Sequence, residues 1–174
     1  TPQLHHFVRI RNGSGGGPPP PEECYFEQLV SAYHMVTPNR SASKVFVDCS
    51  KGIGAPKLAL LAERLADRLE IERFNVDGSV NEDCGAEHVQ KGRVLPCGVD
   101  PAADVGKRMA SMDGDADRLV YFFVKAGSDG LGLVDGAKIA TLFARFIKAQ
   151  ALDIRPGQRL EEAALARHFL GSHH

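Results

Sequence analysis

The sequence predicts a three-layer α/β/α domain with a mixed sheet. Apolar runs and an amphipathic stretch between residues 44 and 125 indicate this fold class. An apolar run over 44–49 is followed by a glycine-containing turn, an amphipathic stretch over 55–69 and a second apolar run over 71–76. A strand, a helix and a strand in that order form a βαβ unit with parallel strands. Two more apolar runs, at 108–112 and 118–125, flank an acidic loop and predict further strands.

Before this unit we expect a lead-in over 1–10, a linker over 11–23 and a helix over 22–36. Glycines make the first half of the linker flexible, and a run of prolines stiffens its second half. The helix carries apolar residues at helical spacing, which predicts one buried face. These residues are Phe26, Leu29, Val30 and Tyr33.

The stretch over 55–69 begins with Pro56, which suits the first turn of a helix. Its apolar residues recur every three or four positions and predict a stripe that faces the core. The stripe consists of Leu58, Leu61, Leu65 and Leu69.

After the βαβ unit the pattern predicts a short helix over 84–92 and a loop over 93–106. Glycines near 127–130 allow a hairpin into a strand at 131–134. A last firm helix starts near Asp135. Its apolar face contains Ile139, Leu142, Phe143, Phe146 and Ile147.

Pro156 and Gly157 end this helix, and a further short helix over 160–170 is expected. The final residues, 171–174, resemble the remnant of a purification tag. The metal-binding domain itself is expected over 24–170.

Composition is that of one soluble globular domain. The chain has 174 residues, 25% charged and 43% hydrophobic, with a formal net charge of −1. This charge favours neither nucleic acid nor a membrane surface as a partner. The four cysteines lack C-x-x-C spacing, so we expect free thiols and a cytoplasmic protein, and the sequence does not distinguish this from import into an organelle.

The most informative segment is the acidic loop, residues 113–118, which reads DGDADR. In an extended or gently turning segment alternate side chains point the same way, so Asp113, Asp115 and Asp117 can converge. Converging carboxylates repel one another unless a cation lies between them, and all-oxygen ligands suit Mg²⁺ or Ca²⁺. Arg118 adds a fork of donors suited to a phosphate. The pattern therefore predicts a metal site for phosphoryl chemistry.

Other interpretations of the loop are weaker. An EF-hand loop starting at Asp113 requires Gly and Glu where this chain has Arg118 and Val124. A plain solvated turn does not require apolar segments on both sides. A charged loop between two buried strands is a common place for a functional site.

The loop and three other segments resemble the α-D-phosphohexomutases, and within them the phosphoacetylglucosamine mutases. Residues 113–121 (DGDADRLVY) resemble the metal-binding loop of that superfamily. Residues 1–5 resemble the segment that leaves the first domain, residues 47–58 (VDCSKGIGAPKL) resemble VDCANGIGALKL, and residues 134–142 (VDGAKIATL) resemble IDGDKIATL. The matches occur in the family's order.

The resemblance implies a phosphotransferring isomerase of four domains, of which this chain is the second. In the family a phosphoserine on the first domain donates its phosphoryl group to N-acetylglucosamine 6-phosphate, and the product is N-acetylglucosamine 1-phosphate. It implies Mg²⁺ held by Asp113, Asp115 and Asp117, with Arg118 orienting the phosphate. The phosphosugar is then bound through domains outside this chain.

Several features depart from the family pattern. Ala137 replaces the second acidic residue of the D-G-D-K-I segment. The phosphoserine loop of the type T-A-S-H-N, the E-A-N-G sugar loop and the R-x-S-G-T-E phosphate loop do not occur in the chain. We therefore expect the chain alone to lack mutase activity.

Two functions from other classes stay open at this point. A metal-dependent glycosyltransferase also uses a D-x-D motif, and it requires a nucleotide pocket at the first strand-to-helix turn. Gly52 and Gly54 supply part of a dinucleotide turn, with Asp77 as the ribose-binding acid, but Lys57 stands where the third glycine belongs. A structural turn is the better interpretation. The other alternative is a non-enzymatic metal-binding module.

Overall fold

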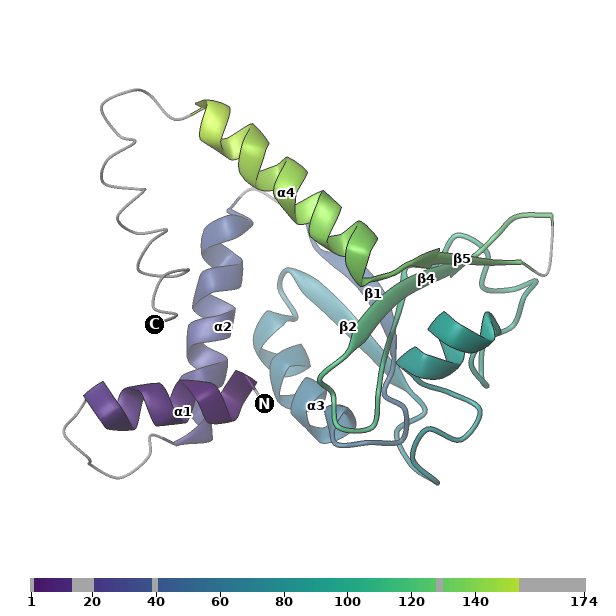
Figure 1. The fold of residues 1–174 in the computed structure, drawn as a ribbon, viewed down its shortest axis with the longest axis horizontal. Coiled ribbons are helices and arrows are strands. Elements are labelled where there is room, and N and C mark those ends of the chain that lie inside the picture. The colour runs from purple at the N-terminus through teal and green to yellow at the C-terminus, as the bar shows by residue number, and fades with distance from the viewer. Residues whose placement is uncertain (1, 14–20, 39–40, 128–129, 154–174) are drawn as a thin grey trace. The chain divides into compact units, whose positions relative to one another are not determined.

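The structure is a computed structural model that describes residues 2–13, 21–38, 41–127 and 130–153 (Figure 1). The chain divides into two compact units, of which the first ends at Asp135 and the second begins at Gly136. Within the described part of the chain, no helix is long and apolar enough to cross a membrane.

Five strands form one mixed sheet in the order β2-β1-β3-β4-β5. The central strand β1 (Ser43–Asp48) runs parallel to both β2 (Leu69–Phe74) and β3 (Met109–Met112). β4 (Leu119–Val124) and β5 (Leu131–Val134) extend the sheet in antiparallel pairing. The α/β class and the mixed sheet are therefore confirmed, as is the parallel βαβ unit.

The described helices of the first unit are α1 (Pro2–Gly13), α2 (Glu22–Val36), α3 (Gly54–Leu65) and the short π-helix η1 (His88–Gly92). In the second unit, α4 spans Gly136–Asp153. The helix α1 covers the described part of the expected lead-in and continues into the expected linker. The predicted helix over 22–36 agrees with α2.

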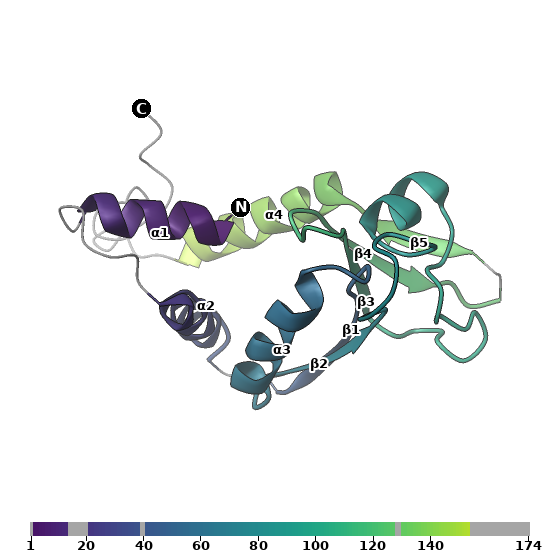
Figure 2. The same cartoon turned by 90° about the horizontal axis from the view of Figure 1, so that it is seen from below.

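Alternation along β4 separates the two faces of the sheet. Val120, Phe122 and Val124 are each 2% exposed, whereas Tyr121 and Phe123 between them are more than 40% exposed. The buried face of β4 packs in a core cluster with residues around η1. This cluster contains Ala86, Val89, Met109, Val120, Phe122 and Leu133. The helix α3 lies against the other face, on the parallel half of the sheet (Figure 2).

The helix in the βαβ unit is shorter than its leucine pattern predicts. It ends at Leu65, and Leu69, the last residue of the expected stripe, is the first residue of β2. There Leu69 pairs in parallel register with Ser43 of β1. The stripe prediction was wrong at this residue because pairing with the neighbouring strand outweighs local helix propensity.

Some predictions fall outside the described residues. They are the middle of the linker, the breaker at 156–157, the short helix over 160–170 and the tag remnant at 171–174. The domain bounds stay a prediction.

Candidate metal centre

The acidic loop lies where strands of the sheet end together. β1 ends at Asp48 and β3 ends at Met112, and the two strands are parallel, so both carboxyl ends meet at one edge of the sheet. Asp113 is the first residue after β3. Ligands of open α/β sheets bind outside the carboxyl ends of the strands. The fold thus places the loop at a typical position for a site.

The loop turns more tightly than the sequence suggested. The amide of Ala116 donates to the carbonyl of Asp113 at 3.1 Å, and Ala116 has a φ of +58°. The loop is therefore a tight turn, not the extended or gently turning segment that was expected. The three carboxylates still converge, because the turn folds the two ends of the loop towards each other.

Asp113, Asp115 and Asp117 each offer one carboxylate oxygen, and these oxygens lie within 4.8 Å of one another. Asp113 is buried, with 3% of its surface exposed, while Asp115 and Asp117 are exposed. One anchored and two solvent-facing carboxylates make a cluster that is open to an ion from solution.

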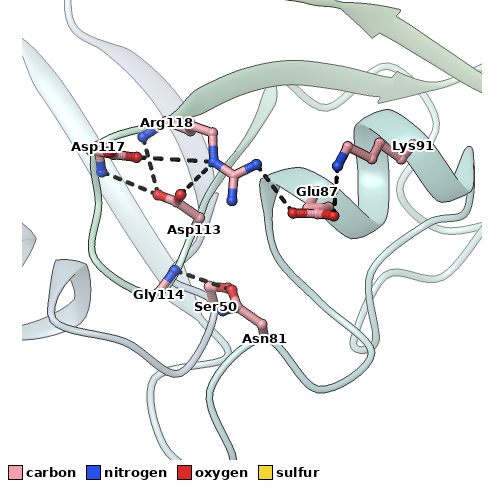
Figure 3. Close-up of polar contacts among 8 residues, drawn as sticks. All are labelled: Ser50, Asn81, Glu87, Lys91, Asp113, Gly114, Asp117 and Arg118. Atoms are coloured by element: carbon pink, nitrogen blue, oxygen red, sulfur yellow. Dashed lines mark hydrogen bonds and ion pairs between the residues drawn. The ribbon is translucent and has the colours of Figure 1, made fainter.

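Asp113 is held by its own loop and by the arginine that follows it. Its Oδ1 accepts hydrogen bonds from the amides of Asp117 and Arg118, at 3.1 and 3.0 Å (Figure 3). Its Oδ2 accepts from Nε of Arg118 at 2.6 Å. A carboxylate has about four lone-pair sites. These three bonds leave one site, on Oδ2, for a metal ion.

The negative charges of the loop act on one another, and this appears in the pKa of Asp117. The negative charge of Asp115, partial desolvation and the charge of Asp113 together raise the pKa of Asp117 above its ordinary value. Burial alone raises the pKa of Asp113, but hydrogen bonds from the side chain and backbone of Arg118 lower it by more. Arg118 stabilises one carboxylate of the cluster, and Asp117 remains under repulsion.

Arg118 is itself held from a second side. Its Nη1 donates to Oε2 of Glu87 at 3.2 Å, and Oε1 of Glu87 accepts from Lys91 at 2.8 Å (Figure 3). Hydrogen bonds from Lys91 and Arg118 lower the pKa of Glu87. The ion pairs of Arg118 with Asp113, Asp117 and Glu87 use only Nε and Nη1, so further N–H donors of the guanidinium remain for an anion. Glu87 was not singled out from the sequence, because nothing in its own segment marks it.

The glycine turn after β1 packs directly on the acidic loop. The amide of Ile53 donates to the carbonyl of Gly114 at 3.0 Å. A Cβ at Gly52 would lie 2.2 Å from that carbonyl oxygen, and one at Gly54 would lie 2.4 Å from Cε of Met112. These two glycines make room for the loop and for β3. The geometry supports the structural interpretation of the turn over a nucleotide site.

Asp48, the last residue of β1, connects several segments near the acidic loop. It is fully buried, and its Oδ1 accepts from the Ser50 amide at 3.0 Å. Its Oδ2 accepts from the Gly85 amide at 2.7 Å and from the Ser111 hydroxyl at 2.6 Å. The carboxylate ties β1 and β3 to the segment that leads to Glu87.

The neighbouring Cys49 is a small buried residue. It has no exposed surface, and burial raises the pKa of its thiol to about 11. All four cysteines lie within the described ranges, and all are free thiols, in agreement with the sequence.

The residues present fit a magnesium ion. Three carboxylates at this spacing supply the hard oxygen ligands that Mg²⁺ prefers, and exposure of two of them allows water and phosphate to complete its shell. The hydrogen bonds of Asp113 leave one lone pair on its Oδ2 for such an ion.

Comparisons with known proteins agree on one family. The family model described as "Phosphoacetylglucosamine mutase AMG1, domain II" matches residues 23–120, more than half of the chain. The phosphoacetylglucosamine mutase of Arabidopsis thaliana is 39% identical over 176 aligned residues, which cover 95% of this chain and 31% of that protein. The mouse phosphoacetylglucosamine mutase is also 39% identical, over 88% of this chain and 29% of that protein.

Solved structures give the same result. The chain superposes on Aspergillus fumigatus N-acetylphosphoglucosamine mutase in complex with GlcNAc-6P and magnesium with a TM-score of 0.74 and 37% identity, covering 84% of this chain and 31% of that one. An N-acetylglucosamine-phosphate mutase in the apo-form gives a TM-score of 0.80 and 31% identity, over 90% and 34% of the two chains. This chain thus spans about a third of its relatives' length. On its sequence and its fold, the chain belongs to the phosphoacetylglucosamine mutase family and corresponds to the second domain of its members.

Proposed function

We propose that this chain is the metal-binding domain of a phosphosugar mutase that converts N-acetylglucosamine 6-phosphate into N-acetylglucosamine 1-phosphate, a step towards UDP-N-acetylglucosamine. The observation that carries the proposal is the convergence of Asp113, Asp115 and Asp117 beside the Arg118 guanidinium, in a chain of this family. A relative solved with GlcNAc-6P and magnesium supports the substrate class and the cation.

The three aspartates hold Mg²⁺ in this proposal. Asp113 would hold the ion through Oδ2, whose remaining lone pair its hydrogen bonds leave unused, together with the exposed carboxylates of Asp115 and Asp117. When bound, the ion stabilises negative charge on the phosphoryl group being transferred. Three carboxylates leave coordination positions for that phosphate and for water.

Arg118 orients the phosphate beside the ion. Its guanidinium is fixed by Asp113 on one side and by Glu87 on the other, so its remaining donors keep one direction. A fixed planar fork recognises phosphate better than a mobile one because less side-chain entropy is lost on binding. Other domains of the protein would carry the donor phosphoserine and bind the phosphosugar. The expected domain over 24–170 would hold the metal ion and provide Arg118.

A metal-dependent glycosyltransferase is the competing function for a D-x-D loop. It requires space for a nucleotide at the turn after β1, and there Gly52 and Gly54 are packed against Gly114 and Met112. Titration of the full-length protein with nucleotide-sugars and with hexose phosphates separates the two functions. We expect binding of the hexose phosphates alone, and binding of a nucleotide-sugar would contradict the mutase proposal.

The 174-residue chain alone is expected to have no mutase activity. The physical reason is that the phosphoryl donor and the sugar-binding loops do not occur in its sequence. The measurement is turnover of N-acetylglucosamine 6-phosphate by the purified chain, with a full-length relative as the positive control. Turnover above background would mean that the donor lies within this chain and that the assignment of roles is wrong.

The chain alone is also expected to bind Mg²⁺ weakly. Magnesium loses its water reluctantly and is usually held by one or two carboxylates together with substrate phosphate, which this domain does not supply. Calorimetric titration with Mg²⁺ measures this, with the Asp115→Asn chain as the matched control, in which the remaining heat should disappear. Sub-micromolar affinity, or equal heats from both chains, would contradict the expected site.

A further inference from the structure

The geometry points to Asn81 as a positioning residue that sets the conformation of the acidic loop, an inference that rests on the proposed metal site and names a further residue for it. Asn81 lies in the segment between β2 and η1, more than thirty residues before the loop. Its Oδ1 accepts a hydrogen bond from the amide of Gly114 at 3.1 Å (Figure 3). Gly114 is the residue between the ligands Asp113 and Asp115.

Asn81 is tied to the rigid edge of the sheet at two points. Its amide donates to the carbonyl of Ser50 at 3.0 Å, and its Oδ1 accepts from the Ser50 hydroxyl at 2.6 Å. Ser50 is fully buried, and its own amide donates to the buried carboxylate of Asp48. A continuous chain of hydrogen bonds therefore runs from the end of β1 through Ser50 and Asn81 to Gly114.

The backbone at this position favours asparagine. Asn81 has a φ of +62°, in the left-handed region that asparagine tolerates better than most residues. Its side-chain oxygen also provides an acceptor that reaches two donors at once. An aspartate meets both requirements, since it offers the same oxygen and also tolerates this φ.

Packing makes the position of Gly114 sensitive to its neighbours. A Cβ on Gly114 would lie 2.3 Å from Cγ1 of Val80 and 3.0 Å from Nδ2 of Asn81. On its other side, the carbonyl of Gly114 accepts from the Ile53 amide. Gly114 is thus held through both its N–H and its C=O, and loss of the Asn81 contact releases the N–H. Gly114 lies between Asp113 and Asp115, so this release loosens the spacing of the ligands.

The test uses two readouts on the 174-residue chain, the exchange rate of the Gly114 amide by NMR and the affinity for Mg²⁺ by titration. In Asn81→Ala we expect the Gly114 amide to exchange several times faster and Mg²⁺ to bind on the order of fivefold more weakly, the change that corresponds to loss of the one hydrogen bond that Asn81 makes to the acidic loop. In Asn81→Asp the acceptor is retained, so amide protection should match the wild type and affinity should be at least equal.

Asn75→Ala is the matched control. Asn75 also has a positive φ, of +51°, but its side chain donates to Oδ1 of Asp48 at 2.9 Å and to the carbonyl of Cys97 at 3.0 Å, and not to the acidic loop. This variant tests general loosening of the sheet edge. It should leave exchange at Gly114 and Mg²⁺ affinity close to those of the wild type.

The outcomes distinguish failure of the proposed role of Asn81 from failure of the proposed metal site. Wild-type behaviour of Asn81→Ala in both readouts, or equal losses in Asn75→Ala, overturns the role of Asn81. Faster exchange in Asn81→Ala, restored in Asn81→Asp, supports that role even if the wild-type chain shows no Mg²⁺ binding, and in that case the proposed metal site fails alone.

Discussion

Asp115→Ala in the full-length enzyme is expected to lose mutase activity by about a hundredfold or more while the fold stays intact. Asp115 is exposed and converges with Asp113 and Asp117, so its removal takes away one proposed ligand of the metal ion. Loss of this ligand would also remove part of the electrostatic stabilisation of the phosphoryl group being transferred. The measurement is a mutase assay at saturating Mg²⁺.

Stability should hold in this variant, or rise slightly. The charge of Asp115 is the largest factor that raises the pKa of Asp117, so the metal-free loop is under repulsion that the substitution relieves. A melting curve measured without Mg²⁺ tests this. A variant that melts early, or one that keeps near-normal turnover, would show that the loop is a structural turn.

Asp77→Ala provides the control for a general effect of removing an exposed aspartate. Asp77 is the residue that a dinucleotide site after β1 would use for the ribose. The mutase proposal predicts normal turnover for this variant. A loss as large as that of Asp115→Ala would instead favour nucleotide chemistry at the glycine turn.

Local sequence patterns predicted the strands and most helices, because the residues of one segment are enough to favour a strand or a helix there. The apolar runs at 44–49 and 118–125 lie within a residue of β1 and β4, since a strand buried by neighbours on one or both faces must be apolar. The end of α3 was misplaced because the register of β2 is set by β1, more than twenty residues away. The convergence of the aspartates was expected, but the turn that produces it was not.

The residues that support the loop could not be found in the same way. Glu87 and Asn81 reach the loop across about thirty residues of chain, and neither belongs to a local motif. Asn81 gave one faint signal, since asparagine is a common choice for a left-handed backbone position. Asn81 and Glu87 meet the acidic loop only because the parallel strands β1, β2 and β3 bring the segments that follow them to the same edge of the sheet.

Gly52→Ala is expected to destabilise the domain and to displace the acidic loop. A Cβ at this position would lie 2.2 Å from the carbonyl oxygen of Gly114 and 2.6 Å from its Cα, and both are backbone atoms that no rotamer change can move. The turn after β1 and the acidic loop must then separate, which breaks the hydrogen bond from Ile53 to Gly114. Overpacking of this kind destabilises by about 1–3 kcal/mol.

Thermal melting and Mg²⁺ titration of the same chain measure the two consequences together. For a domain of this size the loss in stability lowers Tm by several degrees, and displacement of Gly114 should weaken Mg²⁺ binding along with it. Gly92→Ala is the matched control, because the nearest atom to its added Cβ, Cγ2 of Val94, lies at an ordinary 3.9 Å. If Gly52→Ala melts and titrates like Gly92→Ala, the two loops are not in contact, and the glycine turn does not position the acidic loop.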